Sequence, residues 1–172
     1  AGLKPSSRIL DAPIRIGTWS PRNFQRRHQG EVTLAHGLAQ SINTVAVRVA
    51  EHAGRKNVVR TAQRLGITSP LKAQPSLALG TAEVSLLELV SAYAPFANGG
   101  AAVWPHGITE IRDGQNKVLY RRKGSGPSQI IDPQYVRHMN TMLGRVVQSG
   151  TGRKAKLDRP TAGKTGTSQN YR

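Results

Sequence analysis

The sequence predicts an α+β fold in which several helices accompany a few antiparallel strands. Apolar residues recur at helical spacing through the first hundred residues and again near residue 140, whereas short apolar pieces flank a turn at Asp113-Gly114. The 172 residues are enough for one domain or a piece of one. The chain has no cysteine, which excludes disulfide scaffolds, cysteine-ligated zinc sites and thiol nucleophiles.

The first segment of the chain predicts irregular structure. Residues 1–30 are rich in proline, arginine and serine, and they predict a surface segment of loops with one short strand. A helix is expected from about Thr33, because its hydroxyl can cap the apolar run that follows. Residues 68–80 contain two prolines and predict a second long loop.

Three further helices are predicted before residue 100. The apolar pattern resumes after a pause and predicts a helix capped by Asn43 or Thr44 and ended by Gly54. The next helix is ended by Gly66. A strongly apolar helix is expected from Thr81, and its composition predicts that it is buried.

In the second half of the chain the spacing of apolar residues changes from a helical to a strand-like pattern. Residues 101–123 predict a β-hairpin or a nearby loop. Asp132-Pro133 places a capping residue before a proline at the first helical position, and the helix that it begins is ended by Gly150. Residues 161–167 predict a strand.

The charge is strongly basic, with 25 Lys+Arg against 9 Asp+Glu and a formal net charge of +16. The basic residues form only small clusters, such as Arg121-Arg122-Lys123, without interleaved aromatic residues or a zinc-knuckle or helix-turn-helix pattern. We therefore expect no nucleic-acid partner, and interpret the charge as solvated loops attracted to some polyanion.

Gly163-Lys164-Thr165 has two chemical interpretations. A phosphate-binding loop would require a glycine five residues before Gly163, where this chain has Asp158, whose carboxylate would repel phosphate. The alternative is the K-T-G motif of penicillin-recognising serine enzymes, formed here by Lys164, Thr165 and Gly166 and followed by Thr167. In that motif the lysine and the hydroxyls can hold a carboxylate, while glycine lets a substrate peptide approach.

Ser41-Ile42-Asn43 fits the S-x-N motif of the same enzymes. A serine hydroxyl can pass a proton, and an amide can hold a peptide carbonyl, when one tight turn projects both. The alternative is that Asn43 only caps a helix. The two motifs together, in this order and far apart in the chain, are far more specific than either alone.

The chain resembles the transpeptidase domain of class A, or bifunctional, penicillin-binding proteins. The similarity extends beyond the two motifs to residues 15–24, 32–46, 64–67, 76–84, 89–100 and 162–171. It implies a partial fold of the penicillin-binding and serine β-lactamase type, with helices packed on an antiparallel sheet. It also implies a parent protein with a membrane anchor and a glycosyltransferase domain, on the periplasmic, extracytoplasmic side of the inner membrane.

The resemblance implies peptidoglycan cross-linking by acyl transfer from a D-Ala-D-Ala stem peptide to an amine acceptor, with β-lactams as mimics of the donor. Ser41 would relay a proton, and Asn43 would hold the amide on the acyl side. Lys164, Thr165 and Thr167 would bind the donor carboxylate beside Gly166. Neither a cofactor nor a metal is expected, because the five histidines have no metal-binding spacing.

The nucleophile is the one departure from the family pattern. The family uses the serine of an S-x-x-K motif that precedes S-x-N, and nothing in residues 1–40 fits it. The match Ser69-Pro70-Leu71-Lys72 follows S-x-N in a loop with prolines, where a helical serine–lysine pair is not expected. We therefore expect residues 1–172 to be a transpeptidase domain cut at both ends, inactive alone, with its nucleophile upstream of Ala1.

Two other functions remain open. A non-catalytic cell-wall scaffold of the same fold would keep both motifs but lack the upstream serine. A basic module that binds polyanions would show salt-sensitive association and no reaction with penicillin.

Overall fold

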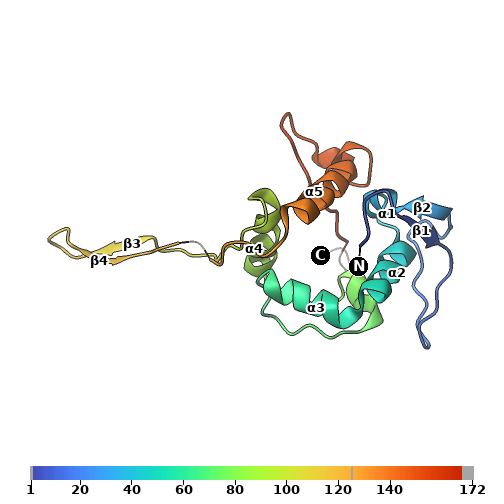
Figure 1. Ribbon diagram of the computed structural model, residues 1–172, viewed down its shortest axis with the longest axis horizontal. Coiled ribbons are helices and arrows are strands. Elements are labelled where there is room, and N and C mark those ends of the chain that lie inside the picture. The colour runs from blue at the N-terminus through green and yellow to red at the C-terminus, as the bar shows by residue number, and fades with distance from the viewer. Residues whose placement is uncertain (1, 125, 168–172) are drawn as a thin grey trace.

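A computed structural model describes residues 2–124 and 126–167, and Figure 1 shows the arrangement of its elements. The described chain combines α-helices with two small antiparallel sheets, which confirms the predicted α+β class. In chain order the elements are β1 (Arg8–Asp11), β2 (Gly30–Thr33), α1 (Leu34–Ala39), α2 (Asn43–Ala53), α3 (Arg55–Arg64), η1 (Pro75–Leu79), α4 (Leu86–Ala97), β3 (Glu110–Arg112), β4 (Val118–Arg121), α5 (Pro133–Gln148) and η2 (Arg153–Ala155).

The first sheet and the first two helices form one packed unit. β1 and β2 pair antiparallel, with Ile9 opposite Val32, and both strands contact α1. Val32 packs in a buried cluster with Ile42 and Val45 from the start of α2. The short strand predicted in the first thirty residues is therefore β1. Its half-buried Ile9 packs against this cluster, whereas Leu10 is exposed, and this difference between the two faces favours the observed register.

Helix α5 packs against α1, so residues 133–148 lie beside residues 34–39. Both helices begin as predicted, because Thr33 accepts a hydrogen bond from the His36 amide and Asp132 accepts one from the Gln134 amide. After α5 the backbone turns tightly, and the Thr151 amide donates to the Ala39 carbonyl at 3.0 Å. This bond ties the segment that leads to Lys164 to the end of α1.

Substitution of Gly150 tests this close approach. A Cβ at position 150 would overlap the Ala39 carbonyl oxygen and lie 2.9 Å from the Val146 Cα, so Gly150→Ala requires the backbone to shift. We expect it to lower the free energy of unfolding by about 2 kcal/mol, measured by urea denaturation of the longer native protein that contains this chain.

Gly144→Ala is the matched control for that measurement. Gly144 lies inside α5, and a Cβ there meets no atom within 4 Å. The same change should therefore raise the free energy of unfolding by about 0.5–1 kcal/mol through helix propensity. Equal effects of the two substitutions would argue against the contact between α5 and α1.

Two predictions about helix starts are wrong. The apolar helix begins at Leu86 rather than Thr81, because Ser85 accepts a hydrogen bond from the Glu88 amide and the Glu88 carboxylate accepts one from the Ser85 amide. Its burial is also wrong: Leu86 is 77% exposed, and only Ser91, Ala92 and Pro95 of α4 are buried. Neither of the two residues proposed as caps acts as a cap on α2, whose N-cap is Ile42.

The predicted hairpin is present, and the predicted strand near the end is not. β3 and β4 pair antiparallel and project away from the helices in Figure 1. Residues 161–167 form no regular secondary structure and pair with no strand among the described residues. Residues 168–171 of the matched family segment lie outside the described residues.

No helix in the described part of the chain is long and apolar enough to cross a membrane.

Candidate active site

Ser41 lies in the tight turn between α1 and α2. Its φ is +55°, a left-handed conformation that is unfavourable for a residue with a side chain. The turn is held by the Ser41 amide, which donates to the Leu38 carbonyl at 3.1 Å, and by the Ile42 amide, which donates to the Gly37 carbonyl at 2.9 Å. A Cβ on Gly37 would lie 2.6 Å from Val45 Cγ1, so glycine at this position lets the two helices meet closely and sets the turn.

Lys164 meets Ser41 across 123 residues of sequence. The Lys164 Nζ donates to the Ser41 Oγ at 2.8 Å and to the Thr165 carbonyl at 2.9 Å. The Thr165 hydroxyl also hydrogen-bonds the Thr151 hydroxyl at 2.7 Å, next to the backbone bond that joins Thr151 to α1. The structure thus brings residues of the predicted S-x-N and K-T-G motifs into direct contact.

This contact can serve proton transfer. The Lys164 ammonium occupies an acceptor position of the Ser41 hydroxyl and leaves the hydroxyl proton free for a third group. Lys164 is half-buried, and desolvation lowers its pKa because burial disfavours the charged amine. A lysine with a lowered pKa exchanges its proton more readily near neutral pH than an exposed lysine does.

The other predicted site residues lie near this pair, with different contacts. The Asn43 side-chain amide donates to the Arg22 carbonyl at 2.7 Å, so here it braces the preceding loop. Gly166 and Thr167 are exposed, and neither makes a hydrogen bond within the described residues. A Cβ on Gly166 would meet nothing within 4 Å, so the surface beside the motif is open to a ligand.

The buried carboxylate of Asp11, which the sequence analysis did not single out, supports the S-x-N turn by bonding Thr44, the residue after Asn43. Asp11 is 1% exposed and accepts hydrogen bonds from the Thr44 hydroxyl at 2.6 Å and the Asn23 amide at 2.8 Å. The Gln29 backbone amide donates to it at 2.9 Å, and the His28 ring nitrogen lies 3.0 Å away. A lone aspartate at the end of a strand carries no spacing signal, so the sequence offered nothing that would identify it.

The network fixes the protonation of Asp11 and the start of α2. Burial by itself would raise the pKa of Asp11, but the hydrogen bonds from Thr44, His28, Asn23 and Gln29 outweigh it and hold the pKa at about 2. The Asn23 side chain also accepts from the Thr44 amide at 3.2 Å. Asp11 and Asn23 therefore satisfy the polar groups of the residue that directly follows Asn43.

Ser69 is the serine of the S-x-x-K match that follows the S-x-N motif, and it is hydrogen-bonded to Glu88. Its hydroxyl and amide both donate to the Glu88 carboxylate at 2.7 Å, and so do the amide and hydroxyl of Thr68. These bonds lower the pKa of Glu88 and keep it ionised. Ser69 and Lys72 lie in a loop and not in a helix, as the prolines predicted. The match therefore lacks the helical geometry of a serine–lysine pair.

Comparison with known proteins identifies the family. The model of the penicillin-binding protein transpeptidase domain matches residues 1–172. The chain belongs to this family. Penicillin-binding protein 1A of Aquifex aeolicus is 38% identical over 170 residues, which cover 98% of this chain and 23% of that protein. Penicillin-binding protein 1A of Neisseria meningitidis is 35% identical over 180 residues, which cover 96% of this chain and 23% of that protein.

Solved structures agree with the assignment to penicillin-binding proteins. Penicillin-binding protein 1A of Haemophilus influenzae superposes with a TM-score of 0.89 at 27% identity, over 98% of this chain and 32% of that one. A penicillin-binding protein of Mycobacterium tuberculosis, at 21% identity and a TM-score of 0.85, shares the fold. The resemblance to a class A transpeptidase domain is thereby confirmed. The chain spans about a quarter of the length of the curated relatives it matches.

Proposed function

We propose that this chain is part of a serine-type D,D-transpeptidase that cross-links peptidoglycan stem peptides and is acylated by β-lactams. The observation that carries the proposal is the 2.8 Å contact between the Lys164 Nζ and the Ser41 Oγ. A basic module that only bound polyanions would have no need to half-bury a lysine against a serine held in a left-handed turn.

Each motif residue has a proposed role in acyl transfer. Ser41 relays a proton between the nucleophile and the leaving amine, with Lys164 as its partner. Lys164, Thr165 and Thr167 bind the carboxylate of the D-Ala-D-Ala donor, and the open surface at Gly166 leaves room for the peptide. Asn43 holds the acyl-side amide once it releases the Arg22 carbonyl.

The nucleophile is proposed to lie outside these 172 residues. The S-x-x-K match at Ser69 follows Ser41, and its serine hydroxyl is hydrogen-bonded to Glu88. No S-x-x-K pattern occurs in residues 1–40. The 172 residues by themselves are accordingly expected to be inactive. In the longer protein we place the domain on the periplasmic, extracytoplasmic face of the inner membrane, held by an anchor and preceded by a glycosyltransferase domain.

Covalent labelling of the longer native protein tests the proposal. After incubation with a penicillin, intact-mass spectrometry should detect one adduct per protein on a serine outside residues 1–172. Mutation of that serine to alanine should abolish the adduct. Ser69→Ala is the control and should leave the adduct intact, because the amide and hydroxyl of Ser69 donate to Glu88 rather than to a residue of either motif.

The two alternative functions give different outcomes. A folded protein that forms no adduct would support the non-catalytic scaffold. Loss of binding to an anionic polymer at high salt, together with no adduct, would support the polyanion-binding module. Either result would overturn the transpeptidase proposal.

A further inference from the structure

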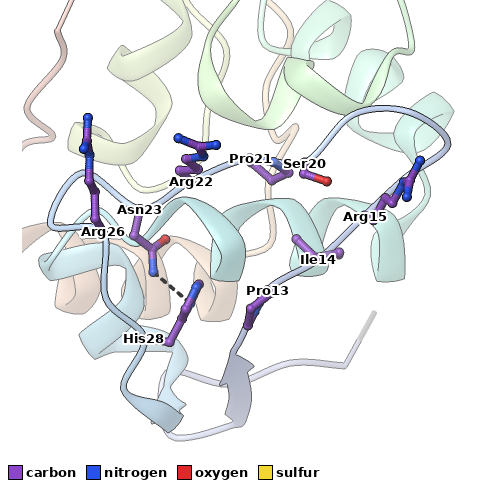
Figure 2. Close-up of a pocket in the computed structure, with 9 residues that line it drawn as sticks. All are labelled: Pro13, Ile14, Arg15, Ser20, Pro21, Arg22, Asn23, Arg26 and His28. Carbon is purple, nitrogen blue, oxygen red and sulfur yellow. Dashed lines mark hydrogen bonds between the residues drawn. The ribbon is translucent and has the colours of Figure 1, made fainter.

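A pocket of about 520 Å³ lies in the loop between β1 and β2, outside the two catalytic motifs. Figure 2 shows Arg22 and Arg26 extending to the same side of this loop, with Arg15 at the opposite end of the pocket and His28 below.

The positive charge of the pocket is not neutralised by the described chain. Within residues 2–124 and 126–167, no carboxylate lies within ion-pair distance of Arg15, Arg22 or Arg26. The Asp11 carboxylate, which is bonded to Asn23 and His28 of this loop, is buried and has four hydrogen-bond partners. Guanidinium groups bind carboxylates through paired, charge-assisted hydrogen bonds, so the pocket is suited to an anionic ligand.

Arg26 occupies a backbone conformation that does not favour arginine. Its φ is +54°, in the left-handed region where glycine is the residue of least strain. Its side chain lines the pocket and makes no ion pair in the described chain. A strained position that carries a charged side chain into a cavity points to a role for that side chain in binding.

The pocket is joined to the S-x-N turn by direct bonds. The Arg22 carbonyl accepts from the Asn43 side chain at 2.7 Å, and the Asn23 side chain accepts from the Thr44 amide at 3.2 Å. A peptide held by Asn43 in the proposed reaction would therefore extend past residues of this loop.

We infer that this pocket, defined by Arg15, Arg22, Arg26 and His28, binds a side-chain or terminal carboxylate of the substrate peptide away from the scissile bond. The inference rests on the proposed transpeptidase function and adds a specificity site to it. It assigns the enzyme a preference for acidic stem peptides over amidated ones.

The test compares two donor peptides in the longer native protein. They share one sequence and the D-Ala-D-Ala end, but one has free carboxylates elsewhere and the other has carboxamides. We expect wild type to favour the acidic peptide in kcat/KM. Arg22→Gln and Arg26→Gly should each reduce that preference about tenfold, mainly by raising KM for the acidic peptide. Arg26→Gly should also raise Tm, because glycine relieves the strain at φ +54°.

Arg27→Gln is the matched control. Arg27 is adjacent in sequence, but it does not line the pocket, and its Nε donates to the Gln25 side chain at 2.9 Å. It should leave the peptide preference unchanged. The inference would be overturned if Arg22→Gln and Arg26→Gly kept the wild-type ratio of kcat/KM for the acidic and the amidated peptide while penicillin labelling stayed normal. The proposed function would then still stand. Loss of preference in Arg27→Gln as well would also overturn it, by pointing to general charge. Absence of the penicillin adduct in wild type would overturn both.

Discussion

Lys164→Met is expected to slow penicillin acylation of the longer protein by about 100- to 1,000-fold, the usual cost of removing one preorganised donor from an acyl-transfer site. Methionine keeps the length of the side chain but removes the ammonium that donates to Ser41 and to the Thr165 carbonyl. The measurement is the second-order acylation rate, followed by intact mass over time. Because the ammonium is proposed both to bind the ligand carboxylate and to support proton relay, both affinity and the acylation step should suffer.

The lowered pKa of Lys164 also predicts how the acylation rate and the free energy of unfolding change with pH. Burial lowers the Lys164 pKa from the usual 10.5, so the amine loses its proton at a lower pH in the folded protein than in the unfolded chain. Acylation by a carboxylate-bearing β-lactam should therefore decline with rising pH before pH 10.5 is reached. Between the two pKa values the unfolded chain binds more protons, so this group makes the free energy of unfolding rise with pH.

Lys156→Met provides the control for these measurements. Lys156 is exposed in the loop before the motif and bonds neither Ser41 nor Thr165. The same substitution there should leave the acylation rate and its pH profile unchanged. Wild-type acylation by a folded Lys164→Met protein would remove the 2.8 Å contact from the mechanism.

The sequence was sufficient to predict features formed by residues close together in the chain, such as helix N-caps. Thr33 and Asp132 cap their helices as expected, because an N-cap needs only a side-chain oxygen and amides two or three residues later. The residue types of the two motifs also indicated a shared site. Their contact depends on the packing of α5 against α1, which sequence spacing does not encode.

Interactions between distant segments were not predictable in the same way. Residues 161–167 have the composition of a strand, but a strand requires a partner with free backbone groups, and no described segment supplies one. The start of α4 was misplaced by five residues, because apolar periodicity outweighed the capping box of Ser85 and Glu88. The Asp11 network joins four segments of the chain, and no two of its members form a sequence motif.

Asp11→Ala is expected to lower the free energy of unfolding by about 3–5 kcal/mol, the range for removing one partner from a buried charged network. The substitution removes the carboxylate that accepts from the Thr44 hydroxyl, the Asn23 amide and the Gln29 backbone amide, and the Asn23 amide keeps its bond to the Arg27 carbonyl. It also releases Thr44, the residue after Asn43, so penicillin acylation should fall even at temperatures where the variant is folded. Urea denaturation at pH 7 gives the first quantity, and intact mass gives the second.

The pH dependence separates loss of the carboxylate from loss of packing. The folded pKa of Asp11 is about 2, below the unfolded value of 3.8, so ionised Asp11 contributes its full stability above about pH 4 and loses it as the pH falls toward 2. The stability difference between wild type and Asp11→Ala should therefore shrink by about 2 kcal/mol over that interval. Asp158→Ala, at an exposed position, should change stability by less than about 0.5 kcal/mol at either pH. A constant difference at all pH values would show that Asp11 acts only by filling space, since packing does not depend on its proton.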